Sequence, residues 1–183
     1  MKRLLNFAMF YVGWFACVLG AARGHSWLGP AVVATLLAVH LAPTAHRAEE
    51  LRLVVAVGLF GFLLDTLQGA AGLYAFKHGG AAPWLCPPWM VALWMIFATT
   101  LNSSMGWLAG RYRLAAAIGA LCGPVSYAAG ARLGAIDLRA DALVSLIGIS
   151  LAWAVAMPAL LMMRDALSRP AARLELRRAT HAF

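Results

Sequence analysis

Residues 51–76 read LRLVVAVGLFGFLLDTLQGAAGLYAF, an apolar run that contains a single acidic side chain, Asp65. A helix needs about 20 apolar residues to cross the hydrocarbon core of a bilayer. This run is long enough, and its apolar residues do not alternate with polar ones as they do in the strands of a membrane barrel. The stretch therefore predicts a membrane-spanning helix with a carboxyl group near its middle.

The composition of the whole chain points the same way. Of its 183 residues, 63% are hydrophobic and only 12% are charged, and the mean hydropathy is +0.78. A soluble domain usually has about 25% charged residues, so we expect lipid to cover most of this surface. The net charge of +8 does not indicate nucleic-acid binding, because the cations stand at the ends of apolar runs rather than on one water-facing surface.

Polar or Gly/Pro-rich stretches separate the apolar runs, and Pro87-Pro88 suits a helix start. Gly123-Pro124 predicts a break within the fifth run. The first run lacks a small-residue cleavage site and is expected to stay as a span rather than to be removed as a signal peptide. We expect an all-α polytopic membrane helix bundle, with one domain at residues 1–163 and six transmembrane helices, at about 4–22, 26–43, 51–76, 88–110, 114–133 and 142–163.

The distribution of Lys and Arg sets the expected orientation. With six spans and the N-terminus inside, eleven of the 15 Lys and Arg side chains lie on the cytoplasmic side and four on the other side. Cytoplasmic loops carry such an excess, so both termini are expected in the cytoplasm. Residues 164–183 form a basic cytoplasmic tail, either an amphipathic helix on anionic lipid or a solvated extension.

Asp65 is expected to face the interior of the bundle. A charged side chain at mid-bilayer costs roughly 2.5–3.5 kcal/mol, so lipid exposure is unfavourable. Gly58, Gly61, Gly69 and Gly72 share the spacing of three or four residues with Asp65. Small residues at this spacing let another helix approach closely, so this face is predicted to pack against a neighbour.

The other polar residues of the apolar runs are expected to meet Asp65 in one pocket. By depth, Asn102, His40 and Asn6 lie towards the inner leaflet, and the predicted pocket opens there. Its expected catalytic residues are Asp65 as acid or base, Asn102 and His40, and its expected substrate-binding residues are Trp94, Gln68, Thr99, Ser103 and Tyr127.

A purely structural interpretation stands beside this one. Asp65 could be protonated and bonded to Asn102 as interhelical glue, and Trp94 and Trp153 could pack in the core instead of lining a cavity for an acyl chain. Hydrogen bonds in membranes contribute only about 0.6–2 kcal/mol, which is less than the insertion cost of the carboxyl group. That balance favours a functional Asp65.

Neither a metal nor a cofactor is expected. The three cysteines have no CxxC or Cys/His ligand spacing, and no HxxxH or HExxH pair occurs. The chain also lacks a GxSxG elbow, an SxxK dyad and a phosphate-binding loop.

Four stretches carry a resemblance to a known family: HRAEE (46–50), LLDTLQG (63–69), PPWMVALWMIFATTLNSSMGWL (87–108) and GALCGPVSYAAGARLGA (119–135). Over residues 4–160 the chain resembles a bacterial family of small inner-membrane proteins described only as a domain of unknown function. The resemblance implies a polytopic protein of the bacterial cytoplasmic membrane, and genes of fatty-acid-modifying methyltransferases beside those of its members favour lipid metabolism. The matching positions are Glu49 or Glu50, Asp65, Pro88, Trp89, Trp94, Asn102, Gly123, Pro124 and Tyr127.

Three functions are compatible with these features. The first is a lipid-handling or lipid-modifying protein with Asp65 as the acid or base. The second is a proton-coupled transporter of small molecules, and the third is a non-catalytic membrane scaffold for a partner enzyme. The expected partners are membrane lipids, with a membrane enzyme or a second copy of the chain as further candidates.

Overall fold

The computed structural model describes the backbone of residues 2–138 and 141–180 and the side chains of residues 3–138 and 141–167. The prediction of an all-α fold is confirmed, with two very short strands added at one end of the molecule. The elements in chain order are α1 (Lys2–Ala22), α2 (Leu28–Leu41), α3 (Arg47–Ala70), β1 (Tyr74–Phe76), α4 (Pro88–Asn102), the 3₁₀ turn η1 (Gly106–Leu108), α5 (Tyr112–Arg132), β2 (Ile136–Leu138) and α6 (Ala142–Thr180).

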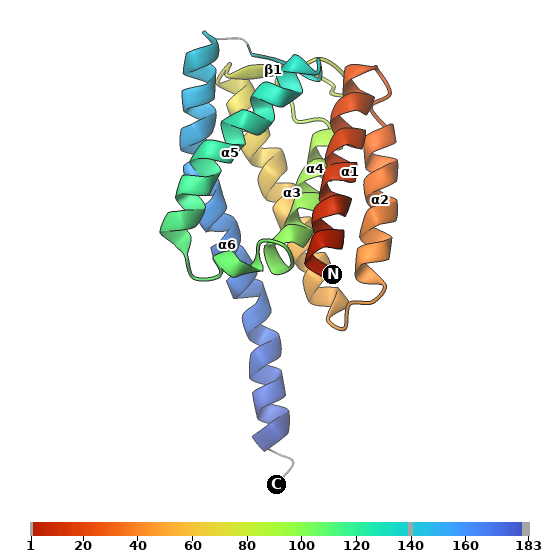
Figure 1. Cartoon of the computed structure of the whole chain (residues 1–183), viewed down its shortest axis with the longest axis vertical. Helices are drawn as coiled ribbons and strands as arrows, with labels where there is room; N and C mark the ends of the chain where they lie inside the picture. Colours follow the sequence, from red (N-terminus) through yellow and green to blue (C-terminus); the bar gives the residue numbers. More distant parts are fainter. Residues whose placement is uncertain (1, 139–140, 181–183) are drawn as a thin grey trace.

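The helices run alternately up and down between two ends of the bundle (Figure 1). We call one end the ribbon end, because β1 and β2 pair there as an antiparallel ribbon with Tyr74 opposite Leu138. We call the other the tail end. It holds the start of α1, the turn at residues 42–46 and η1, and α6 continues past it (Figure 1).

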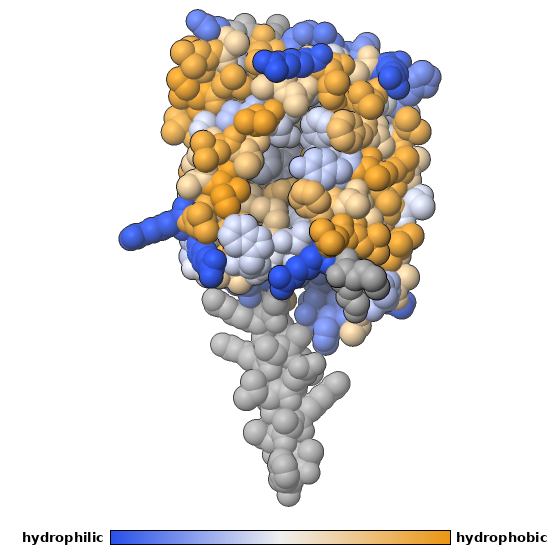
Figure 2. Space-filling model, viewed as in Figure 1, coloured by the Kyte–Doolittle hydropathy of each residue, from blue (hydrophilic) through white to orange (hydrophobic). Residues whose placement is uncertain are grey.

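Among the residues that the structure describes, four helices are long and apolar enough to cross a membrane, namely α1, α3, α5 and α6. Helices α2 and α4 have 14 and 15 residues, fewer than the roughly 20 of a full span. For these two helices the expected membrane crossing stays a prediction. Large apolar side chains such as Leu67 and Val155 are 67% and 71% exposed. On the face shown in Figure 2, apolar residues lie between hydrophilic residues near both ends, as expected of a protein surrounded by lipid.

Two helices end earlier than the sequence pattern predicts. Helix α3 stops at Ala70 rather than at residue 76, because Gly72 adopts a φ of 74° and turns the chain into β1. Asp65 therefore lies five residues from the ribbon end of α3 and not at the middle of the span. Helix α4 stops at Asn102 rather than at residue 110, and η1 follows it.

The helix break predicted at Gly123-Pro124 is wrong. Helix α5 continues through Pro124, although proline cannot donate the usual hydrogen bond to the carbonyl four residues earlier. The Ser150 hydroxyl of α6 donates to that carbonyl, Ala120 O, at 2.8 Å. A neighbouring helix thus satisfies the backbone group that the proline leaves unpaired.

Helix α6 also departs from the expected boundary. Its backbone stays helical from Ala142 to Thr180, so no break separates the bundle from the tail at residue 164. The helix projects beyond the rest of the bundle (Figure 1). Residues 181–183 of the expected tail lie outside the described residues.

Glycines bring the helices close enough to enclose a pair of stacked indoles. A Cβ added at Gly61 of α3 would lie 2.0 Å from Cγ of Trp94, and one at Gly123 would lie 2.4 Å from Cγ of Trp153. The two indole rings stack with centroids 4.9 Å apart. The predicted close approach of a neighbouring helix is therefore confirmed at Gly61, and a Cβ at Gly58 would likewise lie 2.9 Å from Met95 of α4. Gly72 lies beyond the end of α3, and a Cβ there would meet nothing within 4 Å.

Candidate functional site

The Asp65 carboxyl is fully enclosed by hydrogen-bond donors. Its exposed fraction is 0%. Oδ1 accepts hydrogen bonds from the hydroxyls of Tyr74, at 2.8 Å, and Tyr127, and a longer one from Gln68 Nε2 at 3.4 Å. Oδ2 accepts one from Trp94 Nε1 at 2.7 Å. The expectation that Asp65 turns away from lipid is confirmed.

This single carboxyl connects the elements of the ribbon end. Besides Gln68 of α3 itself, its donors lie on β1, α4 and α5, and the Trp94 indole stacks on Trp153 of α6. Burial, followed by the charge of Asp65, raises the pKa of the Tyr74 hydroxyl well above its ordinary value, so Tyr74 keeps its proton and acts as a donor. The arrangement satisfies a buried carboxyl and leaves it no direct contact with a ligand.

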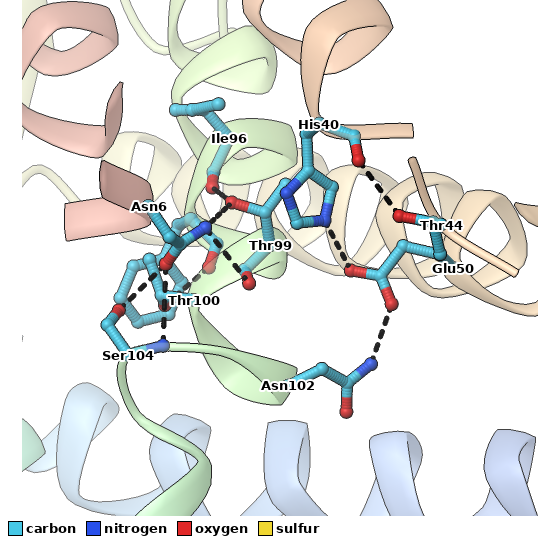
Figure 3. Close-up of polar contacts among 10 residues, drawn as sticks. Asn6, His40, Thr44, Glu50, Ile96, Thr99, Thr100, Asn102 and Ser104 are labelled. Carbon is cyan, nitrogen blue, oxygen red and sulfur yellow. Dashed lines mark hydrogen bonds and ion pairs between the residues drawn. The ribbon is translucent and has the colours of Figure 1, made fainter. Parts of the chain in front are cut away.

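A second polar group lies at the tail end and is shown in Figure 3. Glu50 Oε1 is 3.0 Å from His40 Nε2, and Asn102 Nδ2 donates to Glu50 Oε2 at 2.8 Å. The Glu50 residue is 8% exposed. These three residues, which we call the Glu50 cluster, come from α2, α3 and α4. A carboxylate that orients an imidazole is a common arrangement for proton transfer.

Asn6 forms a third polar group with α4 (Figure 3). Its Nδ2 donates to Thr99 Oγ1 at 3.0 Å, and its Oδ1 accepts a bond from Ser104 Oγ at 2.8 Å. Ser103 lies in the turn after α4, outside both this group and the Glu50 cluster. The Asn6 group thus ties the start of α1 to the end of α4.

The prediction of one pocket that joins Asp65 to Asn102 and His40 is wrong. Asp65 bonds to residues of the ribbon end, whereas His40 and Asn102 bond to Glu50. Glu50 and Asp65 are 15 residues apart on α3, which corresponds to about 22 Å along the helix axis. The expected substrate-binding residues divide in the same way, with Trp94, Gln68 and Tyr127 at Asp65 and Thr99 at Asn6.

Glu50 is the residue of the site that the sequence reasoning missed. In the sequence it stands, as an alternative to Glu49, among the positions that match the resembled family, and no role is predicted for it. A signal is present in the sequence, because the carboxylates of Glu49 and Glu50 stand at the same end of the predicted bundle as His40 and Asn102. A buried carboxylate at that depth needs donors, and those two side chains supply them.

An apolar groove of about 370 Å³ lies between the same three helices. Helix α2 contributes Val33, Ala34 and Leu37, and α3 contributes Phe62. The wall on α4 includes Val91, Ala92 and Met95.

A smaller polar pocket of about 220 Å³ adjoins the Glu50 cluster at the tail end. Arg164 of α6 closes one side, where its Nη1 donates to the carbonyl of Leu101 at 3.2 Å and its Nε donates to Asp165 at 2.9 Å. The polar residues that line this pocket are Thr44, His46, Glu49, Glu50, Asn102 and Arg164. Among the described residues, no group of three or more His, Cys, Asp or Glu is placed to hold a metal ion.

Comparison with protein-family models identifies a family. The model of the family described as "Protein of unknown function (DUF2878)" matches residues 3–159. No curated protein and no solved structure matches the chain. The match covers most of the sequence and includes both Asp65 and the Glu50 cluster. The chain therefore belongs to the DUF2878 family.

Proposed function

We propose that the protein binds a membrane lipid, with the hydrocarbon chain in the groove between α2, α3 and α4 and the polar end at the Glu50 cluster. The observation that carries this proposal is that the apolar groove and the Glu50 cluster are formed by the same three helices. The three helices that line the apolar groove also supply His40, Glu50 and Asn102.

The distances suit an amphiphile. Leu37 and His40 are three residues apart on α2, and Met95 and Asn102 are seven residues apart on α4. At 1.5 Å per residue these separations are about 5 and 10 Å. On α3 the separation is larger, because Phe62 and Glu50 are 12 residues apart, or about 18 Å. A hydrocarbon chain in the groove therefore approaches the cluster along the walls formed by α2 and α4.

The chemistry of the site supports lipid handling over transport. A transporter that couples to Asp65 needs that carboxyl to exchange protons with a path to water. Asp65 is enclosed, and both of its oxygens accept hydrogen bonds from side chains. Glu50 lines the polar pocket and is paired with His40, and such a pair can carry a proton, so we assign any chemistry on the bound lipid to this cluster. We assign Asp65 to holding the ribbon end together.

We place the protein in the bacterial inner membrane, and the positions of the ends support an orientation with both termini on the same side, the cytoplasm. The start of α1 and the extension of α6 lie at the same end of the bundle (Figure 1), and that side carries the expected excess of Lys and Arg. In this orientation the Glu50 cluster lies at the level of the inner leaflet.

Lipid retention tests the proposal. The purified full chain is examined by native mass spectrometry after transfer to a detergent that strips loosely bound lipid. We expect the wild type to retain one lipid and Ala34→Trp to lose it, because the indole fills the groove from its exposed wall. Ala117→Trp on α5 is the matched control, since Ala117 is also an exposed alanine of an apolar helix but does not line the groove. Equal retention by the two variants contradicts the proposal.

A further inference from the structure

The polar pocket at the tail end has more negative than positive charge facing it. Helix α3 presents the carboxylates of Glu49 and Glu50, the turn before it presents His46, and α6 presents Arg164. Arg164 is already engaged, because its guanidinium bonds to the Asp165 carboxylate and to the Leu101 carbonyl. Among the described lining residues, the carboxylates of Glu49 and Glu50 thus stand beside one guanidinium, and that guanidinium bonds to Asp165.

The strong donors at the Glu50 cluster are also committed. His40 Nε2 and Asn102 Nδ2 each bond to one oxygen of Glu50. A carboxylate accepts about four hydrogen bonds, so each oxygen of Glu50 has capacity for one more. Glu49 Oε1 lies 4.0 Å from His46 Nδ1, beyond hydrogen-bond distance. The acceptors that the pocket offers a ligand are therefore the carboxylate oxygens of Glu49 and Glu50.

A group that matches this surface must be cationic and rich in donors. Glu50 is largely removed from water, and a cation with donors adds to the compensation that His40 and Asn102 already give its carboxylate. A primary ammonium group has three donors and one positive charge. It can bond to Glu49 and Glu50 together, which a quaternary ammonium group without N–H donors cannot do.

We propose that the polar pocket lined by Glu49, Glu50 and Asn102 binds the primary ammonium group of a lipid headgroup. This inference rests on the proposed function, because the groove is what holds the ligand on a hydrocarbon chain. The pocket volume of about 220 Å³ suits a small headgroup of the ethanolamine type. An anionic headgroup without an amine meets repulsion from the two glutamates.

The test is a competition among three lipids with identical acyl chains and different headgroups. Delipidated full-length protein is incubated with equal amounts of phosphatidylethanolamine, phosphatidylcholine and phosphatidylglycerol, and the bound lipid is counted by native mass spectrometry. We expect phosphatidylethanolamine to exceed each of the others by roughly tenfold, the size expected when one charge-assisted hydrogen bond is lost.

Three variants assign that preference to the pocket. Glu50→Gln keeps the shape of the side chain and removes its charge, and it is expected to reduce the preference to about twofold or less. Glu49→Gln serves as a second variant at a partly exposed position whose side chain is 27% exposed, so the test does not depend on how Glu50→Gln folds. Asp137→Asn, at an exposed carboxylate paired with Lys77 at the ribbon end, is the matched control and should retain the wild-type preference.

The possible results separate the two proposals. Retention of lipid without a headgroup preference, or with phosphatidylcholine equal to phosphatidylethanolamine, overturns the ammonium site and leaves the lipid-binding function in place. Retention of no lipid by the wild type overturns the proposed function itself. If free ethanolamine at millimolar concentration displaces the lipid, the pocket binds the small amine itself, and the proposal that the ammonium group belongs to a lipid is contradicted. A preference that survives both glutamate variants also overturns the inference.

Discussion

At the scale of single residues, Asp65 shows how a buried carboxyl group can stabilise the fold of a membrane protein. Hydrocarbon excludes the group, and side chains of β1, α3, α4 and α5 supply its hydrogen bonds. Each of those donors is itself in a water-poor region and depends on Asp65 as its acceptor. The energy at stake is thus the combined cost of leaving several buried donors without a partner.

Two substitutions of Asp65 are expected to differ strongly. Asp65→Ala removes the acceptor of Trp94 Nε1 and of the two tyrosine hydroxyls, and it should lower the free energy of unfolding by about 3–5 kcal/mol. Asp65→Asn should cost only about 1 kcal/mol, because its amide oxygen can accept from the indole while its NH₂ group donates to the tyrosines. Reversible unfolding in mixed detergent micelles measures both. Equal losses of stability, or an Asn variant that folds normally but loses lipid, would contradict the structural role.

The sequence predicts the burial of Asp65 but not its partners. Burial follows from the cost of an ionisable group in hydrocarbon, which needs no knowledge of the neighbours. The partners depend on where α3 ends and on how α5 is rotated about its axis. Tyr74 lies beyond the turn at Gly72, which brings its hydroxyl back to Asp65. A pattern that continues the helix to residue 76 instead places Tyr74 more than two helical turns away from Asp65 on the same helix. The longer predicted helix also places Asp65 near the middle of the span, at about the predicted depth of Asn102, so the sequence predicts these two residues as partners.

At the scale of the elements, glycines decide which helices can touch. The contact of α3 with α4 depends on the absence of a side chain at Gly61, where the added Cβ would lie 2.0 Å from the Trp94 ring. The Trp94 side chain cannot retreat without losing its bond to Asp65 and its stacking on Trp153. The spacing of glycines predicts this face well, because it depends only on helical periodicity.

Gly61→Ala is expected to destabilise the bundle by about 1–3 kcal/mol, the usual range for overpacking in a filled core. Gly130→Ala is the matched control on α5. Its Cβ would meet only the Ile136 side chain at 4.0 Å, an ordinary contact, and alanine favours the helix. Thermal unfolding of the two variants in the same detergent gives the comparison. A control that loses as much stability as Gly61→Ala would contradict the proposed packing.

The continuity of α5 through Pro124 leads to a double-mutant test. Ser150→Ala should cost about 1 kcal/mol in the wild type, since it removes the bond from Ser150 to the Ala120 carbonyl. In a Pro124→Ala background the restored N–H of residue 124 takes over that carbonyl, so the same change should cost much less. Unfolding free energies of the four proteins measure the coupling. Additive effects would show that the proline and the serine act independently.

At the scale of the whole molecule, the alternation of the helices agrees with the simplest topology read from the charges. The start of α1 and the end of α6 share one end of the bundle, and the β1–β2 ribbon occupies the other (Figure 1). Hydropathy finds the number and order of the helices reliably, because apolar runs must be bounded by polar turns. Hydropathy does not predict whether a short helix such as α2 or α4 crosses the whole membrane, because that depends on the neighbouring helices that shield its ends from lipid.

Cysteine labelling tests the orientation. In a chain whose three native cysteines are replaced by alanine, one cysteine is placed at Ala81 in the ribbon-end loop or at Ala45 in the tail-end turn, two exposed positions. A membrane-impermeant maleimide applied to bacterial cells with a permeabilised outer membrane should label position 81 and not position 45. Disruption of the inner membrane should make both positions reactive. Labelling of position 45 in intact cells would reverse the assigned topology.

The most direct measurement of the central claim is the place where a bound lipid contacts the protein. A phospholipid with a diazirine on its acyl chain is bound to the purified full chain, photolysed and mapped by peptide mass spectrometry. The account predicts attachment concentrated at the groove-lining parts of α2 and α4, near Ala34 and Val91, and loss of that attachment in Ala34→Trp but not in Ala117→Trp. Attachment spread evenly over exposed apolar residues such as Leu67 and Val155, and unchanged by Ala34→Trp, would contradict it.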